Sequence, residues 1–136
     1  RRMTGTRADA DTVGAIVKDL YSHDWSIRQA AVRRIGSLAS AEDLSSLFSR
    51  LRIEKWYIRE AAAAGIRALD RPILIPALRS VMRDGDDILR SAATCALGNM
   101  RSREAEAILE KAAEDPDCRV RRNAKVSLQR IRAPLP

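Results

Sequence analysis

The chain has 136 residues, of which 46% are hydrophobic, so it can form one domain with a continuous core, which argues against disorder of the whole chain. Aromatic residues make up only 4%, while alanine, leucine, isoleucine and arginine are abundant, a balance that favours helices over β-sandwiches or barrels. No segment approaches the roughly 18 uncharged apolar residues that a membrane helix needs, and no signal-peptide core follows the N-terminus.

The sequence predicts a series of short helices that recur along the chain. Apolar residues at spacings of three and four recur with a 31-residue interval, first as Val13, Ile16 and Leu20, then as Leu44, Leu47 and Leu51, and then as Ile75, Leu78 and Met82. A weaker copy consists of Glu106, Leu109 and Ala113. Pro72 fits the opening turn of the third of these helices, and Pro76 is expected to shift its start or bend it.

A second helix follows each short one. A shift of 31 residues aligns "DWSIRQAAVRRIGSL", which begins at Asp24, with "KWYIREAAAAGIRAL", "DDILRSAATCALGNM" and "DCRVRRNAKVSLQRI". An arginine, a small residue and three large apolar residues recur in fixed columns, the small one being Ala31, Ala62, Ala93 and Ala124. The spacing places the apolar columns on one face of a helix, called here the arginine-containing helix.

These patterns predict one domain over residues 1–136. A leading short helix is expected at about 10–22, followed by repeats at about 24–54, 55–85 and 86–116 and a terminal arginine-containing helix at about 117–132. A single helix pair would leave apolar surface exposed, and stacking against the next pair covers it. The predicted fold is therefore all-α, a right-handed α-solenoid of stacked antiparallel helix pairs. The first residue is Arg1 rather than Met, which suggests a fragment of a longer protein.

The chain resembles the HEAT-like repeat family, particularly the short phycobilisome-lyase HEAT-like repeats. The segment "LIPALRSVMRDGDDILRSAATCALGNM" carries the pattern, with a short helix, an Asp-containing turn, an arginine and a small-residue-rich helix in order, and the resemblance covers roughly residues 12–132. It implies a structural role for the arginine column, in which each guanidinium ties adjacent repeats together through acidic or backbone acceptors. That column comprises Arg28, Arg59, Arg90 and Arg121.

Aspartates precede three of the arginine-containing helices. Asp24, Asp86 and Asp117 are placed to accept hydrogen bonds from the free N–H groups of the first helical turn, and Lys55 interrupts the set.

Large rings at the turns are candidates for protein binding. Trp25 and Trp56 occupy equivalent positions, Tyr57 adjoins the second, and Asp87 and Cys118 replace the rings later, so any aromatic surface is expected in the N-terminal half. The alternative is that the rings pack against a neighbouring turn. Exposed positions of successive short helices form two rows, one with Tyr21, Arg52, Arg83 and Glu114 and one with Lys18, Ser49, Ser80 and Lys111. The resemblance implies that these helices line the concave side, where an extended partner could bind. The alternative there is a merely solvated groove.

Positive charge concentrates at the C-terminal end. Residues 118–136 hold six of the 25 basic residues and none of the 18 acidic ones. Besides Arg121 of the column, the cluster contains Arg119, Arg122, Lys125, Arg130 and Arg132. It predicts binding to nucleic acid, an acidic protein or an anionic surface, and the alternative is that it only solvates the terminal helix.

The sequence favours a non-catalytic adaptor or regulatory scaffold with a protein partner, no cofactor, no metal and no membrane insertion. A nucleic-acid-binding module, a DNA glycosylase-like protein and a bilin-lyase-associated subunit remain alternatives, because other HEAT-like proteins have these roles. His23 alone cannot supply the paired His–Glu motifs of the di-iron class. Two cysteines, Cys95 and Cys118, are too few for a disulfide-rich scaffold, which favours a cytoplasmic location. Val126, Leu128 and Ile131 predict an open apolar end that invites further repeats or end-to-end self-association.

Overall fold

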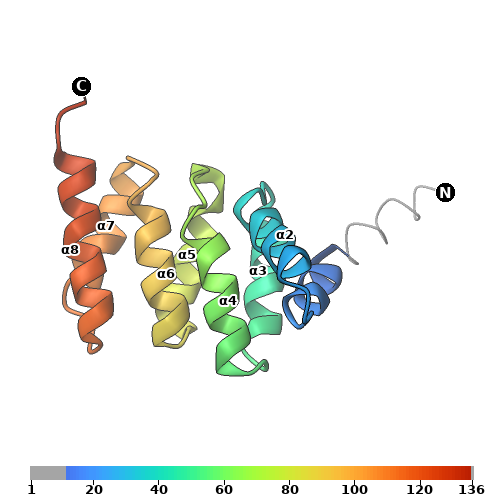
Figure 1. The fold of residues 1–136 in the computed structure, drawn as a ribbon. Coiled ribbons are helices and arrows are strands. Elements are labelled where there is room, and N and C mark those ends of the chain that lie inside the picture. The colour runs from blue at the N-terminus through green and yellow to red at the C-terminus, as the bar shows by residue number, and fades with distance from the viewer. Residues whose placement is uncertain (1–11, 136) are drawn as a thin grey trace.

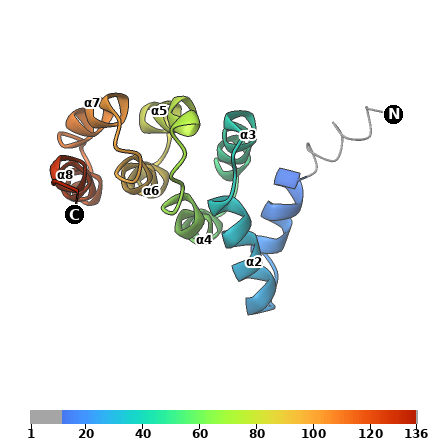
Figure 2. The same ribbon diagram turned by 90° about the horizontal axis from the view of Figure 1, so that it is seen from above.

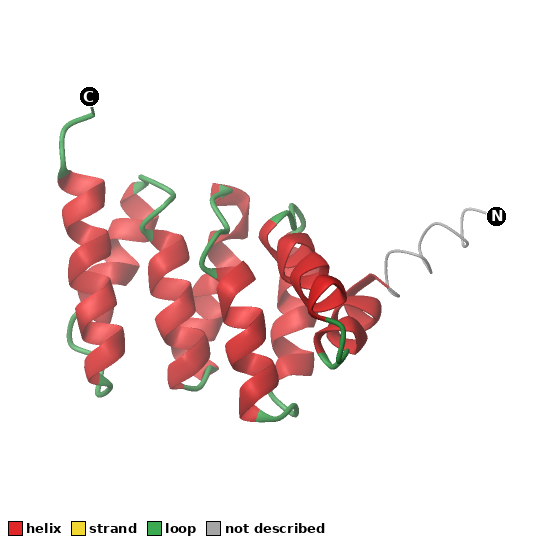
Figure 3. Ribbon diagram, in the orientation of Figure 1, coloured by secondary structure: helices red, strands yellow, loops and turns green. Residues whose placement is uncertain are grey.

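The computed structural model describes residues 12–135, and every regular element within that range is helical (Figures 1 and 3). A helix over residues 12–20 comes first, and residues 10 and 11 of the predicted leading helix lie outside the described range. The others are α2 (Trp25–Gly36), α3 (Ala41–Leu51), α4 (Trp56–Ile66), the 3-10 turn η1 (Pro72–Leu74), α5 (Ile75–Asp84), α6 (Asp87–Leu97), α7 (Arg103–Ala112) and α8 (Cys118–Arg132). The predicted all-α fold, with solenoid-like packing of neighbouring helices, is confirmed.

The helices form two rows. The arginine-containing helices α2, α4, α6 and α8 form one row, in which each contacts the next, and α3, α5 and α7 form the other. Seen from above, the rows bend into an arc with the arginine-containing helices on the inner side (Figure 2). The expectation that the short helices line the concave side is therefore wrong. An ion pair of 3.7 Å between Arg119 of α8 and Glu60 of α4, two helices apart in the row, agrees with this arrangement.

Small residues explain why the inner row is the tighter one. The alanine column, Ala31, Ala62, Ala93 and Ala124, is wholly buried. Gly65 in α4 lies so close to α2 that a Cβ there would be 2.5 Å from the backbone oxygen of Val32. Gly98, just after α6, lies similarly close to Ser127 of α8. Because small side chains let helix backbones approach closely, the arginine-containing row is compressed and the short-helix row splays outward.

The core runs through the whole array between the two rows. Large apolar residues of both helix types are fully buried, among them Ile35, Ile66 and Leu97 from the arginine-containing helices and Leu47, Leu78 and Leu109 from the short ones. Most columns recur from repeat to repeat, so the core extends along the array, although Glu106 replaces an apolar residue in α7 and Ile27 of α2 is exposed.

Capping residues set the helix starts. The predicted aspartate caps are confirmed, since the carboxylates of Asp24, Asp86 and Asp117 accept hydrogen bonds from backbone N–H groups of α2, α6 and α8. Lys55 precedes α4 without a side-chain cap. In the third short helix, Pro72 begins the 3-10 turn η1 and α5 begins only at Ile75, which is the delayed start expected from Pro76.

The last helix presents polar residues along one exposed stripe. Arg122, Lys125, Gln129 and Arg132 are all exposed, at the spacing of one helical face. The expected open apolar end is wrong for Leu128, which packs into the core and is only 8% exposed, and Ile131 is half-buried. Val126 is 49% exposed. The equivalent residues of the preceding helices are Arg33, Ala64 and Cys95, so a large apolar residue does not recur at this position. The exposed face of α8 is therefore mainly polar.

Close packing at Gly65 yields a stability prediction. Gly65→Ala should lower the free energy of unfolding by about 1–3 kcal/mol, because the new methyl group overlaps the backbone of α2 and overpacking carries costs of this size. Urea denaturation followed by circular dichroism measures the effect. Gly36→Ala is the matched control, since its Cβ would make an ordinary contact of 3.4 Å with Ala68. The control should change stability by less than about 1 kcal/mol; equal effects of the two variants would contradict the close approach at Gly65.

Candidate functional site

Exposed aromatic and apolar side chains gather at the first two turns that precede arginine-containing helices. Trp25 is 65% exposed, Trp56 63%, and Ile53, in the turn before α4, 85%. Tyr21 and Tyr57 are also exposed. We call these five residues the aromatic edge. Both turns lie on the lower edge of the array in Figure 1, at the N-terminal ends of α2 and α4.

Contacts within the aromatic edge hold several of its members in place. The rings of Trp56 and Tyr57 meet edge to face, with centroids 5.8 Å apart. The Tyr21 hydroxyl donates to the Glu54 carboxylate, which joins the first turn to the second and raises the pKa of Tyr21 above its usual value. Since most of each indole surface is accessible, Trp25 and Trp56 are not buried against a neighbouring turn.

The later turns lack this character. Asp87 and Cys118 occupy the tryptophan position at the starts of α6 and α8, and both are exposed. Ile53 has no apolar equivalent either, because Ser22, Asp84 and Asp115 stand at its place in the other turns. Sequence reasoning missed Ile53, although an isoleucine in a column of polar turn residues was a visible signal. The aromatic edge is thus confined to the N-terminal half of the described chain.

The other predicted binding residues are separated by the fold. Arg52 lies in the second turn, directly before Ile53, and is exposed. Arg83 lies at the end of α5, where it lines an outer groove between α5 and α7 with Met82 and Ile108. The predicted row therefore does not form one concave surface: Tyr21 belongs to the aromatic edge, Arg52 adjoins it, and Arg83 lies on the outer side.

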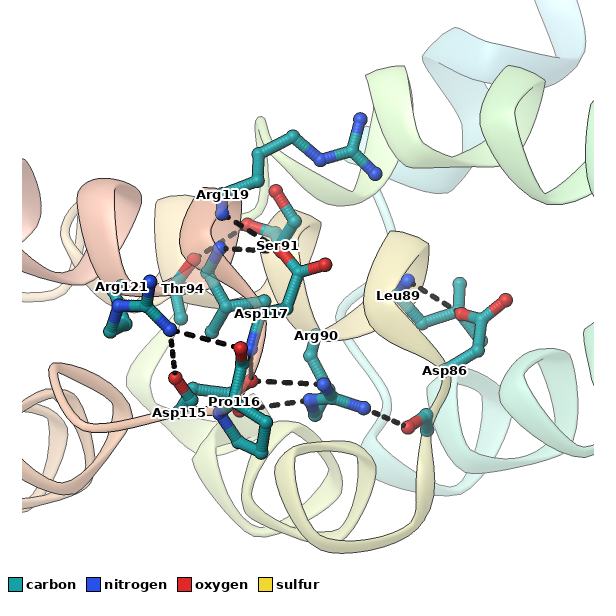
Figure 4. Close-up of polar contacts among 12 residues, drawn as sticks. Asp86, Leu89, Arg90, Ser91, Thr94, Asp115, Pro116, Asp117, Arg119 and Arg121 are labelled. Carbon is teal, nitrogen blue, oxygen red and sulfur yellow. Dashed lines mark hydrogen bonds and ion pairs between the residues drawn. The ribbon is translucent and has the colours of Figure 1, made fainter.

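The arginine column faces the turns. Each guanidinium donates to a backbone carbonyl of the turn before its own helix, the acceptors being Ser22 for Arg28, Glu54 for Arg59, Gly85 for Arg90, and Asp115 and Pro116 for Arg121. Two of the four also reach the following repeat. Arg59 donates to the capping carboxylate of Asp86 at 2.6 Å, and Arg90 makes a two-pronged contact with Asp115 at 2.9 Å (Figure 4).

Asp115 is the most enclosed acceptor of this set. Its burial would by itself raise the pKa of the carboxyl group, but the hydrogen bonds from Arg90 and from the Asp117 N–H, with the charges of Arg90 and Arg121, outweigh burial and lower that pKa. The Asp115 contact in turn raises the pKa of the Arg90 guanidinium, against the opposing effect of burial. The charged forms of both groups are therefore favoured, and Figure 4 shows them joining α6 to the turn before α8.

A comparison with protein families agrees with these repeats. Residues 72–135, which span η1 to the end of α8, match the family model of HEAT repeats. These residues are HEAT-like repeats. No curated protein matches its sequence. HEAT repeats generally serve as scaffolds for protein interactions and are typically non-enzymatic. The finer assignment to phycobilisome-lyase HEAT-like repeats stays a prediction. No helix in residues 12–135 is long and apolar enough to cross a membrane.

The HEAT-like array disperses the predicted C-terminal basic cluster. Arg132 pairs with Glu106 and Glu110 of α7 at 2.6 Å each, and Arg119 pairs with Glu60 of α4. Arg130 donates to the Asn99 side chain at 2.7 Å. Within the described residues, Arg122 and Lys125 have no such partner. The run of basic residues in sequence is therefore not an uncompensated patch in space, because acids from earlier helices lie beside it.

The structural role inferred for the column leads to a test. Arg90→Ala should lower the free energy of unfolding by about 2 kcal/mol, since hydrogen bonds to charged groups contribute on this scale and Asp115 would lose its partner. Thermal and urea denaturation measure the change. Arg79→Ala removes an exposed pair with Glu104, whose closest approach is 3.4 Å, and serves as the control. It should cost less than about 1 kcal/mol; an unchanged melting curve for Arg90→Ala would refute the structural role.

Proposed function

We propose that this HEAT-like chain is a non-catalytic adaptor or regulatory scaffold that anchors a protein partner on the aromatic edge. The observation that carries the proposal is the exposure of two tryptophans, two tyrosines and one isoleucine on two adjacent turns. Aromatic side chains are enriched among the residues that dominate binding energy, and contiguous exposed apolar surface on a soluble domain marks an interaction site. The rigid array behind the edge reduces the entropy lost on binding.

The alternative functions have less support. Acidic partners neutralise much of the C-terminal basic cluster, which weakens the support for a nucleic-acid-binding module or a DNA glycosylase-like protein. A bilin-lyase-associated subunit has no further support than the repeat pattern. End-to-end self-association has support from Val126, although the polar stripe on α8 opposes it. We place the adaptor in the cytoplasm, because both cysteines carry free thiols.

Affinity recovery with the purified chain as bait tests the adaptor proposal. Partners that bind through the aromatic edge should be lost with Trp56→Ala, because truncating a central aromatic anchor typically weakens binding about thirtyfold or more. Ile73→Ala is the matched control: it removes an exposed apolar side chain of the η1 turn, outside the aromatic edge. Quantitative mass spectrometry compares the recovered proteins. If Trp56→Ala retains every partner that the wild-type chain retains, the aromatic edge is not the binding surface.

A further inference from the structure

A basic hollow lies at the other edge of the array, at the C-terminal ends of the arginine-containing helices. It measures about 470 Å³ and is lined by Arg67, Ala68, Asp70, Gly98, Asn99, Arg101 and Arg130. These residues come from the turns that follow α4 and α6 and from the end of α8. In Figure 1 these segments are at the top of the array, whereas the aromatic edge is at the bottom.

The lining of the basic hollow carries an excess of positive charge. Three guanidinium groups face one carboxylate, that of Asp70. Among the ion pairs of the described chain, none involves Arg67, Arg101, Arg130 or Asp70. The three guanidiniums therefore keep N–H donors available for an anion, since each arginine carries five.

The side chain of Asn99 connects the segments that carry Arg67 and Arg130. Asn99 donates to the carbonyls of Arg67 and Leu69 at 2.9 and 3.0 Å, and its own side-chain oxygen accepts from Arg130 Nη2. One amide thus braces three consecutive repeats around the hollow.

Arg101 is fixed by its backbone as well as by its side chain. It has a φ of 43°, in the left-handed region where non-glycine residues are uncommon. Its Nη1 donates to the carbonyl of Ile131 at 3.2 Å and to that of Ala133 at 3.4 Å, which places the guanidinium against the end of α8. Strained backbone of this kind persists where the surrounding structure holds it, and it concentrates at functional sites.

The repeat pattern does not require an arginine at position 67 or at position 130. The equivalents of Arg67 in the other repeats are Gly36, Gly98 and Gln129, and those of Arg130 are Ser37, Ala68 and Asn99. The arginine column, in contrast, recurs in every repeat. Arg67 also donates no hydrogen bond from its side chain within the described residues. An exposed arginine without a partner, placed beside two held ones, contributes a charge that the fold itself does not use.

We propose that the basic hollow binds the phosphoryl group of a phosphorylated serine or threonine in a protein segment. Guanidinium groups match the geometry of phosphate oxygens, and a phosphomonoester brings nearly two negative charges to a site with a surplus of two positive ones. The proposal rests on the adaptor function, and it names the chemistry that a second part of the partner would carry.

The concentration of positive charge in one hollow favours a phosphorylated protein over a nucleic acid as the ligand. A nucleic-acid strand needs repeated phosphate contacts along a track. The arginines of the hollow have neutral equivalents in the first repeat, where Gly36 and Ser37 replace Arg67 and Arg130, so the arrangement of the hollow is not repeated there. Asp70 within the lining would also repel a polyanion that passed across it.

Titration with defined probes tests the proposal on the full chain. The probes are inorganic phosphate, a capped Gly-Ser peptide with one phosphoserine, its unphosphorylated form, and a single-stranded oligonucleotide. Binding is followed by NMR shifts of the backbone amides of Gly98, Asn99 and Arg101. The phosphopeptide should shift these amides and the unphosphorylated peptide should not. Arg67→Gln should weaken phosphopeptide binding about tenfold or more, because it removes a charge-assisted hydrogen bond. Its melting temperature should stay unchanged.

Arg71→Gln is the matched control, since Arg71 is exposed just after the same turn but does not line the hollow. Three outcomes would overturn the proposal: no shift with the phosphopeptide, equal weakening by Arg71→Gln, or tighter binding of the oligonucleotide. Trp56→Ala should leave phosphopeptide affinity intact. A failed partner recovery with intact phosphopeptide binding would therefore count against the adaptor function, and the reverse result against the hollow.

Discussion

The close approach of neighbouring arginine-containing helices is the constraint on which the rest of the structure depends. A buried alanine in every repeat, with glycine at Gly65 and Gly98, lets these helices lie against one another along the inner row. Short-helix neighbours have no such seam, so the array bends toward the row with the small residues (Figure 2). Neither helix of a pair can bury its apolar face alone, and the stack supplies the cover.

Once the helices are stacked in this way, each repeat has two edges with different chemistry. The N-terminal edge carries the turns that the arginine column holds through backbone carbonyls, and in the first two repeats these rigid turns present the aromatic edge. The C-terminal edge carries the basic hollow. Column residues thus stabilise the scaffold, and residues that depart from the repeat, such as Ile53 and Arg67, give individual turns their binding character.

The 31-residue interval made most of the fold predictable, because it places the same residue types on the same helical face four times. It predicted the helix pairs, the aspartate caps and the confinement of aromatic residues to the first two turns. It could not predict the direction of the bend, which depends on how closely two backbones approach in space. Nor could it show that Glu106 and Glu110 lie beside Arg132, since the basic run is free of acids only along the sequence. The basic hollow combines Arg67 with Arg130, 63 positions later, and no local pattern joins them.

Native-state amide hydrogen exchange tests the dependence of each repeat on its neighbour most directly. The full chain is compared with a chain that ends at residue 117 and therefore lacks α8. Because α8 covers α6 and α7, its removal should reduce the protection of amides in these two helices most and that in α3 and α4 least. Full protection of α6 and α7 in the shortened chain would contradict the account, since each helix pair would then be stable without the next.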